Sequence, residues 1–151
     1  MGQIKLILDN MIYNDKPENI FLYHYVEVMI SDYGTFFNSN LKDQDMTIKE
    51  LSVLLRIRFD DIVTQKDLVD VFNVSDAYIA KLLKKFEDYE YIIRMEDPQN
   101  RRKKIVKLTQ KGIGKTDELI TVINNWEKET TSKLTKDEIT TLKKILFKIT
   151  T

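Results

Sequence analysis

Residues 64–111 constrain the fold most, because a helical pattern is followed there by a hairpin pattern. Within residues 75–89 the apolar side chains recur at the spacing that makes one face of a helix. These apolar positions are Ile79, Leu82, Leu83 and Phe86. The opposite face carries Ala77, Lys81 and Lys84. The pattern therefore predicts an amphipathic helix with a basic outer face.

Residues 92–108 have the pattern of a β-hairpin. An apolar lead-in is followed by Asp-Pro-Gln-Asn at residues 97–100, a sequence typical of a tight turn. The returning segment, residues 104–108, alternates polar and apolar side chains as a half-buried strand does. The tip is cationic and carries Arg101, Arg102, Lys103 and Lys104. A helix with a basic face followed by a cationic hairpin is the outline of a winged helix that binds DNA.

A short helix is predicted directly before the basic one. Thr64 and Asp67 have the spacing of a capping box, in which each side chain binds the backbone N–H of the other residue. Asn73 tolerates the left-handed conformation that ends many helices, and Ser75 is a typical N-cap. Two short helices joined in this way form a helix-turn-helix, whose second helix reads the DNA groove.

Three further helices have recognisable starts. Capping boxes join Thr47 to Glu50 and Thr135 to Glu138, and Thr109 begins a long helix after the hairpin. The last helix carries a narrow apolar seam, formed by Ile139, Leu142, Ile145, Leu146 and Ile149. We expect this seam to pack against the N-terminal helices of its own chain or of a second copy.

Two helices are expected at the N-terminus, over residues 4–11 and about residues 18–37, with Gly34 and the polar residues 38–40 marking the end of the second. The second is apolar nearly all round. A helix without a polar face must be covered on several sides. This leaves two alternatives, a central core helix or a helix that also packs across a subunit interface.

Composition narrows the functional classes. The chain of 151 residues is 42% hydrophobic, which is enough for about one domain with a buried core. Its formal net charge is zero, which argues against a general binder of polyanions, but residues 75–111 carry an excess of positive charge. No cysteine is present, so disulfides, thiolate metal sites and thiol redox switches are excluded.

No pattern for a signal peptide, a myristoylation site or a membrane span is found, so we expect a cytoplasmic protein without a membrane partner. The sequence also lacks a glycine-rich phosphate loop, a nucleophile beside a base and a cluster of metal-ligating residues. An enzyme is therefore not expected, and neither a cofactor nor a metal is predicted.

Several motifs resemble those of the MarR family of winged helix-turn-helix transcription regulators. They are Leu-Leu-Arg-Ile at residues 54–57, Thr-Gln-Lys-Asp-Leu at 64–68, residues 82–87, Asp-Pro-Gln-Asn-Arg-Arg at 97–102 and Val-Lys-Leu-Thr-Gln-Lys-Gly at 106–112. The resemblance runs from about Ile20 to the C-terminus. One departure is Asn100, where the family usually has an aspartate that pairs with a nearby arginine at the wing tip.

The resemblance implies a mainly α fold with a small β-hairpin wing. The winged helix-turn-helix DNA-binding domain would occupy residues 47–111, between dimerisation helices at residues 1–46 and 112–151. It implies a homodimer that binds a palindromic operator on double-stranded DNA and regulates transcription, with repression as the expected effect. Each protomer would place its recognition helix in a major groove and its wing along the adjacent minor groove.

The candidate DNA-binding residues are Thr64, Gln65, Ser75, Ala77, Tyr78, Lys81, Lys84, Lys85, Arg101, Arg102 and Lys103. Arginines suit a narrow, negative minor groove, and we assign the largest role to Arg102. Lysines reach phosphates or guanine edges, and a small residue such as Ala77 allows a close approach to a thymine methyl. As alternatives, Lys84 and Lys85 are simply solvated, Ser75 is a cap, and Tyr78 packs against the wing.

Many members of this family release DNA when a small aromatic or phenolic anion binds. The candidate pocket residues here are Tyr23, Tyr25, Met29 and Tyr33, with Arg56 as the counter-ion. The alternative is that these aromatic and methionine side chains belong to the core. Two other functions stay open: a winged-helix module that binds a protein through the same hairpin, and a regulator that has no ligand.

Overall fold

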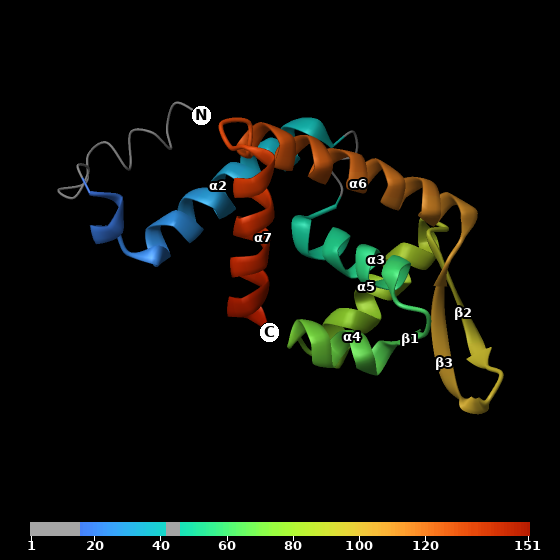
Figure 1. Ribbon diagram of the computed structural model, residues 1–151. Helices are drawn as coiled ribbons and strands as arrows, with labels where there is room; N and C mark the ends of the chain where they lie inside the picture. The colour runs from blue at the N-terminus through green and yellow to red at the C-terminus, as the bar shows by residue number, and fades with distance from the viewer. Residues whose placement is uncertain (1–15, 42–45) are drawn as a thin grey trace. The chain divides into compact units, whose positions relative to one another are not determined.

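The computed structural model describes residues 16–41 and 46–151, apart from the side chains of Arg101 and Arg102 (Figure 1). Six α-helices, a 3₁₀ turn and a three-stranded antiparallel sheet make up this described part. The mainly α fold with a small β-hairpin wing is thereby confirmed. The chain divides into two compact units, one formed by residues up to Ser39 together with Val122–Thr151, and the other by Asn40–Thr121.

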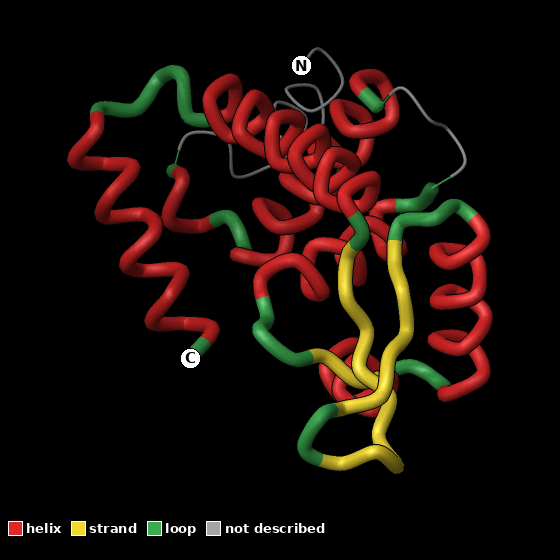
Figure 2. The backbone as a smooth tube through the Cα atoms, turned by 90° about the vertical axis from the view of Figure 1, so that its right-hand side faces the viewer, coloured by secondary structure: helices red, strands yellow, loops and turns green. Residues whose placement is uncertain are grey.

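The second unit contains the helix-turn-helix and the hairpin. Its elements are α3 (Ile48–Phe59), β1 (Val63–Thr64), α4 (Gln65–Phe72), α5 (Asp76–Asp88), β2 (Ile92–Asp97), β3 (Asn100–Leu108) and the first part of α6 (Gln110–Thr130). Strands β2 and β3 form the long hairpin visible in Figure 2, with Ile92 opposite Leu108 at its base and Glu96 opposite Lys104 near its tip. The helix and hairpin that the sequence predicts are both present.

Strand β1 was not predicted. It pairs with β3 through Val63 opposite Val106 and Thr64 opposite Ile105, which gives the strand order β1-β3-β2. Two residues are too few to show an alternating pattern, so the sequence carries no signal for this strand. Its effect is to attach the start of α4 to the returning strand of the hairpin.

The predicted helix caps are confirmed. Thr47 with Glu50, Thr64 with Asp67 and Thr135 with Glu138 each form the reciprocal pair of bonds of a capping box. Asn73 has the left-handed conformation, with φ of 48° and ψ of 52°, between α4 and α5. These local signals fix where α3, α4 and α7 (Lys136–Thr150) begin and where α4 turns into α5.

The core of the second unit lies between α5 and its neighbours. The predicted apolar face of α5 is buried, and its side chains are Ile79, Leu82, Leu83 and Phe86. The sheet contributes Val63, Ile92 and Val106, which are also buried. Because the buried face of α5 is fully occupied, its opposite face is left to meet solvent or a ligand.

The first unit contains η1 (Pro17–Asn19), α2 (Leu22–Asn40, except its last residue), the end of α6 and α7 (Lys136–Thr150). The helix predicted over residues 18–37 is displaced. Pro17 begins a 3₁₀ turn and Ile20 is extended, so the α-helix starts at Leu22. It also continues to Asn40, through the polar residues 38–40 that were expected to follow its end. The helix expected over residues 4–11 lies outside the described residues.

Within the first unit, side-chain contacts join α2, α6 and α7. The indole Nε1 of Trp126 donates to Asp32 at 3.0 Å, and the Tyr33 ring packs edge-on against the Trp126 ring. The ammonium group of Lys143 on α7 pairs with the Glu127 carboxylate on α6. A polar link and a ring contact therefore hold α2 beside α6.

Helix α2 is not a central core helix of the single chain. Of its residues, all of which the structure describes, Phe37 alone is buried. Ile30 is 66% exposed, and on α7 Ile145 and Ile149 are 52% and 61% exposed. Large apolar side chains on α2 and α7 are thus left exposed. In the part of the chain that the structure describes, none of the helices has the length and apolar character that crossing a membrane requires.

Candidate nucleic-acid interface

The outer face of α5 is built as the sequence predicts. Ala77, Lys81 and Lys84 are exposed on the side of the helix opposite its buried residues. Tyr78 lies at the edge of this face and is 37% exposed. The face therefore presents one small side chain, one aromatic side chain and two cations.

The two lysines on this face have different surroundings. Among the described residues no ion pair involves Lys81, whereas the Nζ of Lys84 lies 2.6 Å from a carboxylate oxygen of Asp88. This hydrogen bond, together with the charge of Asp88, raises the pKa of the Lys84 ammonium above its ordinary value. Lys84 thus has a partner in the free protein, and Lys81 is the cation of this face with its charge unmatched by such a pair.

Lys85 is turned toward α3 instead of the outer face. Its Nζ lies 3.2 Å from both carboxylate oxygens of Glu50, and it also sits 5.9 Å from the centre of the Tyr89 ring. Glu50 is the acidic member of the capping box that starts α3. Lys85 therefore links the recognition helix to the start of α3, a contact between distant segments that sequence patterns do not reveal.

The C-terminal end of α5 carries acidic side chains. Asp88 pairs with Lys84, and Glu87 pairs with Arg94 of β2 at 3.1 Å. Helix α5 begins with the exposed Asp76, and the segment from Ala77 to Lys81 that follows carries no acidic side chain. Since phosphates are repelled by carboxylates, this segment is the part of α5 best suited to approach DNA.

The predicted hydroxyl contacts are already used as helix caps. The Ser75 hydroxyl accepts a bond from the Tyr78 N–H, and the Thr64 hydroxyl donates to Asp67 at 2.7 Å and accepts from the Asp67 N–H. The bonds that the Thr64 hydroxyl and N–H donate to the Asp67 carboxylate hold the pKa of this carboxyl below its usual range, with smaller contributions from the charges of Lys103 and Lys66. An anionic carboxylate thus occupies the start of α4, beside the half-buried Gln65, where a phosphate contact was predicted.

The hairpin keeps its predicted turn. Asp97 accepts a bond from the Gln99 N–H at 2.9 Å, and Asn100 stands opposite Asp97 in the strand register. Lys103 and Lys104 of β3 are exposed. Arg101 and Arg102 also lie on β3, but their side chains are outside the described residues. The two described lysines of the predicted basic cluster are therefore open to solvent, and Glu96 lies opposite Lys104 in the strand register.

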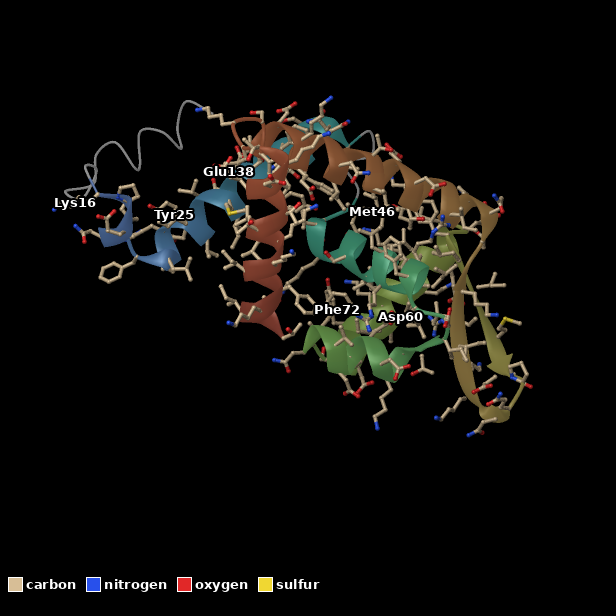
Figure 3. All side chains as sticks on the ribbon, in the orientation of Figure 1. Lys16, Tyr25, Met46, Asp60, Phe72 and Glu138 are labelled. Atoms are coloured by element: carbon tan, nitrogen blue, oxygen red, sulfur yellow. The ribbon has the colours of Figure 1, made fainter. Side chains whose placement is uncertain are left out.

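Three of the four candidate pocket residues on α2 share a face of the helix. Tyr25, Met29 and Tyr33 are spaced four residues apart and share one face of α2, whereas Tyr23 lies on another face and donates to Glu27. Figure 3 labels Tyr25 on α2 and Asp60 at the end of α3. Arg56 belongs to the second unit, and its guanidinium pairs with Asp60 at 2.5 Å.

A family model described as a winged helix DNA-binding domain matches residues 46–112. The multiple antibiotic resistance protein MarR of Escherichia coli is 27% identical over 113 residues, which cover 74% of this chain and 78% of that protein. A crystal structure of MarR superposes with a TM-score of 0.75 at 26% identity, over 87% of this chain and 90% of that one. The chain is thus similar to MarR over most of its length and shares the MarR fold.

The resemblance found in the sequence is confirmed, and the matched family model and relatives support a DNA-binding transcription regulator. Two further structures share its fold. A MarR mutant from E. coli complexed with operator DNA has a TM-score of 0.68 at 23% identity, over 93% of this chain and 99% of that one. BpsR of Bordetella bronchiseptica, whose DNA binding is regulated by 6-hydroxynicotinic acid, has a TM-score of 0.70 at 19% identity, over 86% and 93%. The matched proteins are regulators and not enzymes.

Proposed function

We propose that this protein is a homodimeric, sequence-specific repressor that binds a palindromic operator. Each protomer places the N-terminal half of α5 in a major groove. The observation that carries this proposal is the outer face of α5, where Ala77, Tyr78 and Lys81 are exposed. On this face Lys81 has no ion-pair partner among the described residues. A small residue beside an unpaired cation permits close contact with base edges.

The uncovered apolar faces support the homodimer. The first unit exposes Ile30 on α2 and both Ile145 and Ile149 on α7. A second copy of the chain offers the same faces, so an isologous interface covers both at once. The dimer also presents two copies of α5, which explains why the operator is proposed to be palindromic.

The wing is proposed to follow the adjacent minor groove. Lys103 is exposed on β3, and Arg101 and Arg102 precede it in the sequence. A narrow minor groove has an enhanced negative potential that attracts arginine. Lys84, Thr64 and Ser75 already have intramolecular hydrogen bonds, and Gln65 lies beside the Asp67 carboxylate. We therefore assign to these four residues only secondary contacts with phosphates. For Lys85 we propose a structural role instead, in which its ion pair with Glu50 joins α5 to α3.

Selection of bound sequences from random double-stranded DNA tests this proposal most directly. The expected result is an inverted repeat whose half-sites are centred roughly 10 base pairs apart, the pitch of one helical turn. Its affinity should fall steeply with salt, as neutralised phosphates require. No enrichment, together with indifference to DNA at low salt, would favour the alternative of a winged-helix module that binds a protein.

Arg102→Ala is expected to weaken operator binding by about 10- to 100-fold, because each half-site loses one groove contact. Dimerisation should be unchanged, since the wing lies in the other unit from α2 and α7. Fluorescence anisotropy with the selected operator measures the affinity. Lys133→Ala, which removes a positive charge from the exposed α6–α7 turn, is the control and should bind as the wild type does. An affinity of Arg102→Ala equal to that of the control would contradict the role of the wing.

A small aromatic anion is proposed as the effector that releases DNA. The shared face of Tyr25, Met29 and Tyr33 supports an aromatic ligand, and BpsR gives a precedent among proteins of this fold. Such a ligand must bind the released state more tightly than the DNA-bound state, because equal affinity shifts no equilibrium. Calorimetry with a panel of aromatic acids tests this, and no heat across the panel would favour a regulator without a ligand.

A further inference from the structure

The C-terminal end of α5 is held by an unusual residue. The Tyr91 N–H bonds the Phe86 carbonyl and the Glu90 N–H bonds the Glu87 carbonyl, both at 2.8 Å, which is the pattern of a Schellman motif. The left-handed position of this motif usually holds glycine. Here it holds Glu90, whose φ is 60°. A side chain at this position is disfavoured, so other contacts must hold the turn in place.

Thr109, the first residue after the returning strand β3, supplies these contacts. Its N–H donates to the Tyr91 carbonyl at 3.0 Å, and its hydroxyl donates to the Glu90 carbonyl at 2.6 Å. The same hydroxyl accepts the Gly112 N–H at 3.0 Å and so caps α6. One side chain therefore joins the end of α5, the base of the hairpin and the start of α6.

Two neighbours reinforce the same turn. The Nζ of Lys111 lies 3.4 Å from the Glu90 carboxylate and 5.7 Å from the centre of the Tyr91 ring. A Cβ atom on Gly112 would lie 2.0 Å from the Tyr91 carbonyl oxygen, so the start of α6 rests directly on this turn. The segment from Thr109 to Gly112 thus contacts Glu90 and Tyr91 through backbone and side chains.

These contacts act at the point where α5 passes into the wing. Only Tyr89, Glu90 and Tyr91 separate α5 from β2, and the strand ladder ends at the pair of Ile92 and Leu108. Without the Thr109 hydroxyl, the Glu90 carbonyl loses its partner and the hairpin is joined to α5 by a turn that Glu90 disfavours. The direction of the hairpin relative to α5 would then vary.

We propose that Thr109 is a positioning residue for DNA binding, which fixes the angle between the recognition helix α5 and the wing. This inference rests on the proposed function, because it requires that α5 and the wing enter neighbouring grooves together. A fixed angle lets both elements bind without a loss of conformational freedom on contact with DNA.

Spin labels on the protein test the angle without DNA. The chain has no native cysteine, so Asp76→Cys at the start of α5 and Gln99→Cys at the wing turn attach labels at two exposed sites alone. Labelled chain is diluted with unlabelled chain, so that distances within one protomer dominate. Thr109→Val keeps the shape of the side chain but removes the hydroxyl, whereas Thr109→Ser keeps the hydroxyl.

We expect Thr109→Val to broaden the distance distribution well below its melting temperature and to weaken operator binding by roughly tenfold in the unlabelled chain. Thr109→Ser should restore both. An unchanged distance distribution in Thr109→Val would show that the Thr109 hydroxyl does not fix the angle between α5 and the wing. A broadened distribution with full operator affinity would overturn its role in DNA binding. Failure of the wild type to bind any selected DNA would instead refute the proposed function. The distance measurement would still show whether Thr109 fixes the angle between α5 and the wing.

Discussion

Gly112→Ala is expected to destabilise the second unit by about 3 kcal/mol, an effect at the upper end of those seen when a packed site is overfilled. The new Cβ would lie 2.0 Å from the carbonyl oxygen of Tyr91 and 3.1 Å from Cδ2 of Leu108. A backbone oxygen does not move aside as a flexible side chain does, so the start of α6 must shift from the base of the hairpin. Urea unfolding at one fixed protomer concentration measures the loss.

Gly114→Ala is the matched control, because it makes the same change two positions later in the same helix. Nothing lies within 4 Å of a Cβ at this position, which is exposed. Alanine favours a helix over glycine by about 1 kcal/mol, so this variant should be more stable than the wild type. The two substitutions are therefore expected to act in opposite directions. Equal stabilisation by both would show that Gly112 does not rest on the Tyr91 backbone.

Local signals in the sequence predict much of the second unit. The threonine caps, the Asp-Pro-Gln-Asn turn and the left-handed Asn73 each depend on residues close in sequence, and the structure has all of them. Glu90 has the same left-handed conformation as Asn73, but glutamate carries no such preference. Its conformation depends on Thr109 and Lys111, which follow the hairpin in sequence and contact Glu90 only in the folded chain. The local pattern therefore did not predict it.

The candidate site shows the same division between local and distant contacts. The spacing of α5 predicts which residues face outward, and Ala77, Lys81 and Lys84 are indeed exposed. It does not reveal that Lys85 pairs with Glu50, because α3 and α5 are brought together by the fold. Two lysines of similar appearance in the sequence thus have different roles: Lys81 faces outward without an ion pair among the described residues, and Lys85 joins two helices.

Ile145→Glu is expected to convert the proposed dimer to a monomer and, as a consequence, to reduce operator affinity by more than about 100-fold. Ile145 is 52% exposed on α7 and shares its face with Leu142 and Ile149. In an interface between identical copies the substitution appears twice, and each unpaired carboxylate would have to leave water. Sedimentation equilibrium measures the association, and anisotropy with the selected operator measures DNA binding.

Thr140→Glu makes the same change in charge on α7 and serves as the control. Thr140 is exposed and lies about 140° around the helix from Ile145, at 100° per residue, so its carboxylate would point away from the apolar seam. This variant should remain dimeric and bind the operator normally. Ile145 lies outside the unit that contains α5 and the wing, so we expect its effect on DNA binding to follow from the loss of association. A dimeric Ile145→Glu variant would remove α7 from the interface, and a monomeric variant with full operator affinity would show that a single wing and recognition helix suffice.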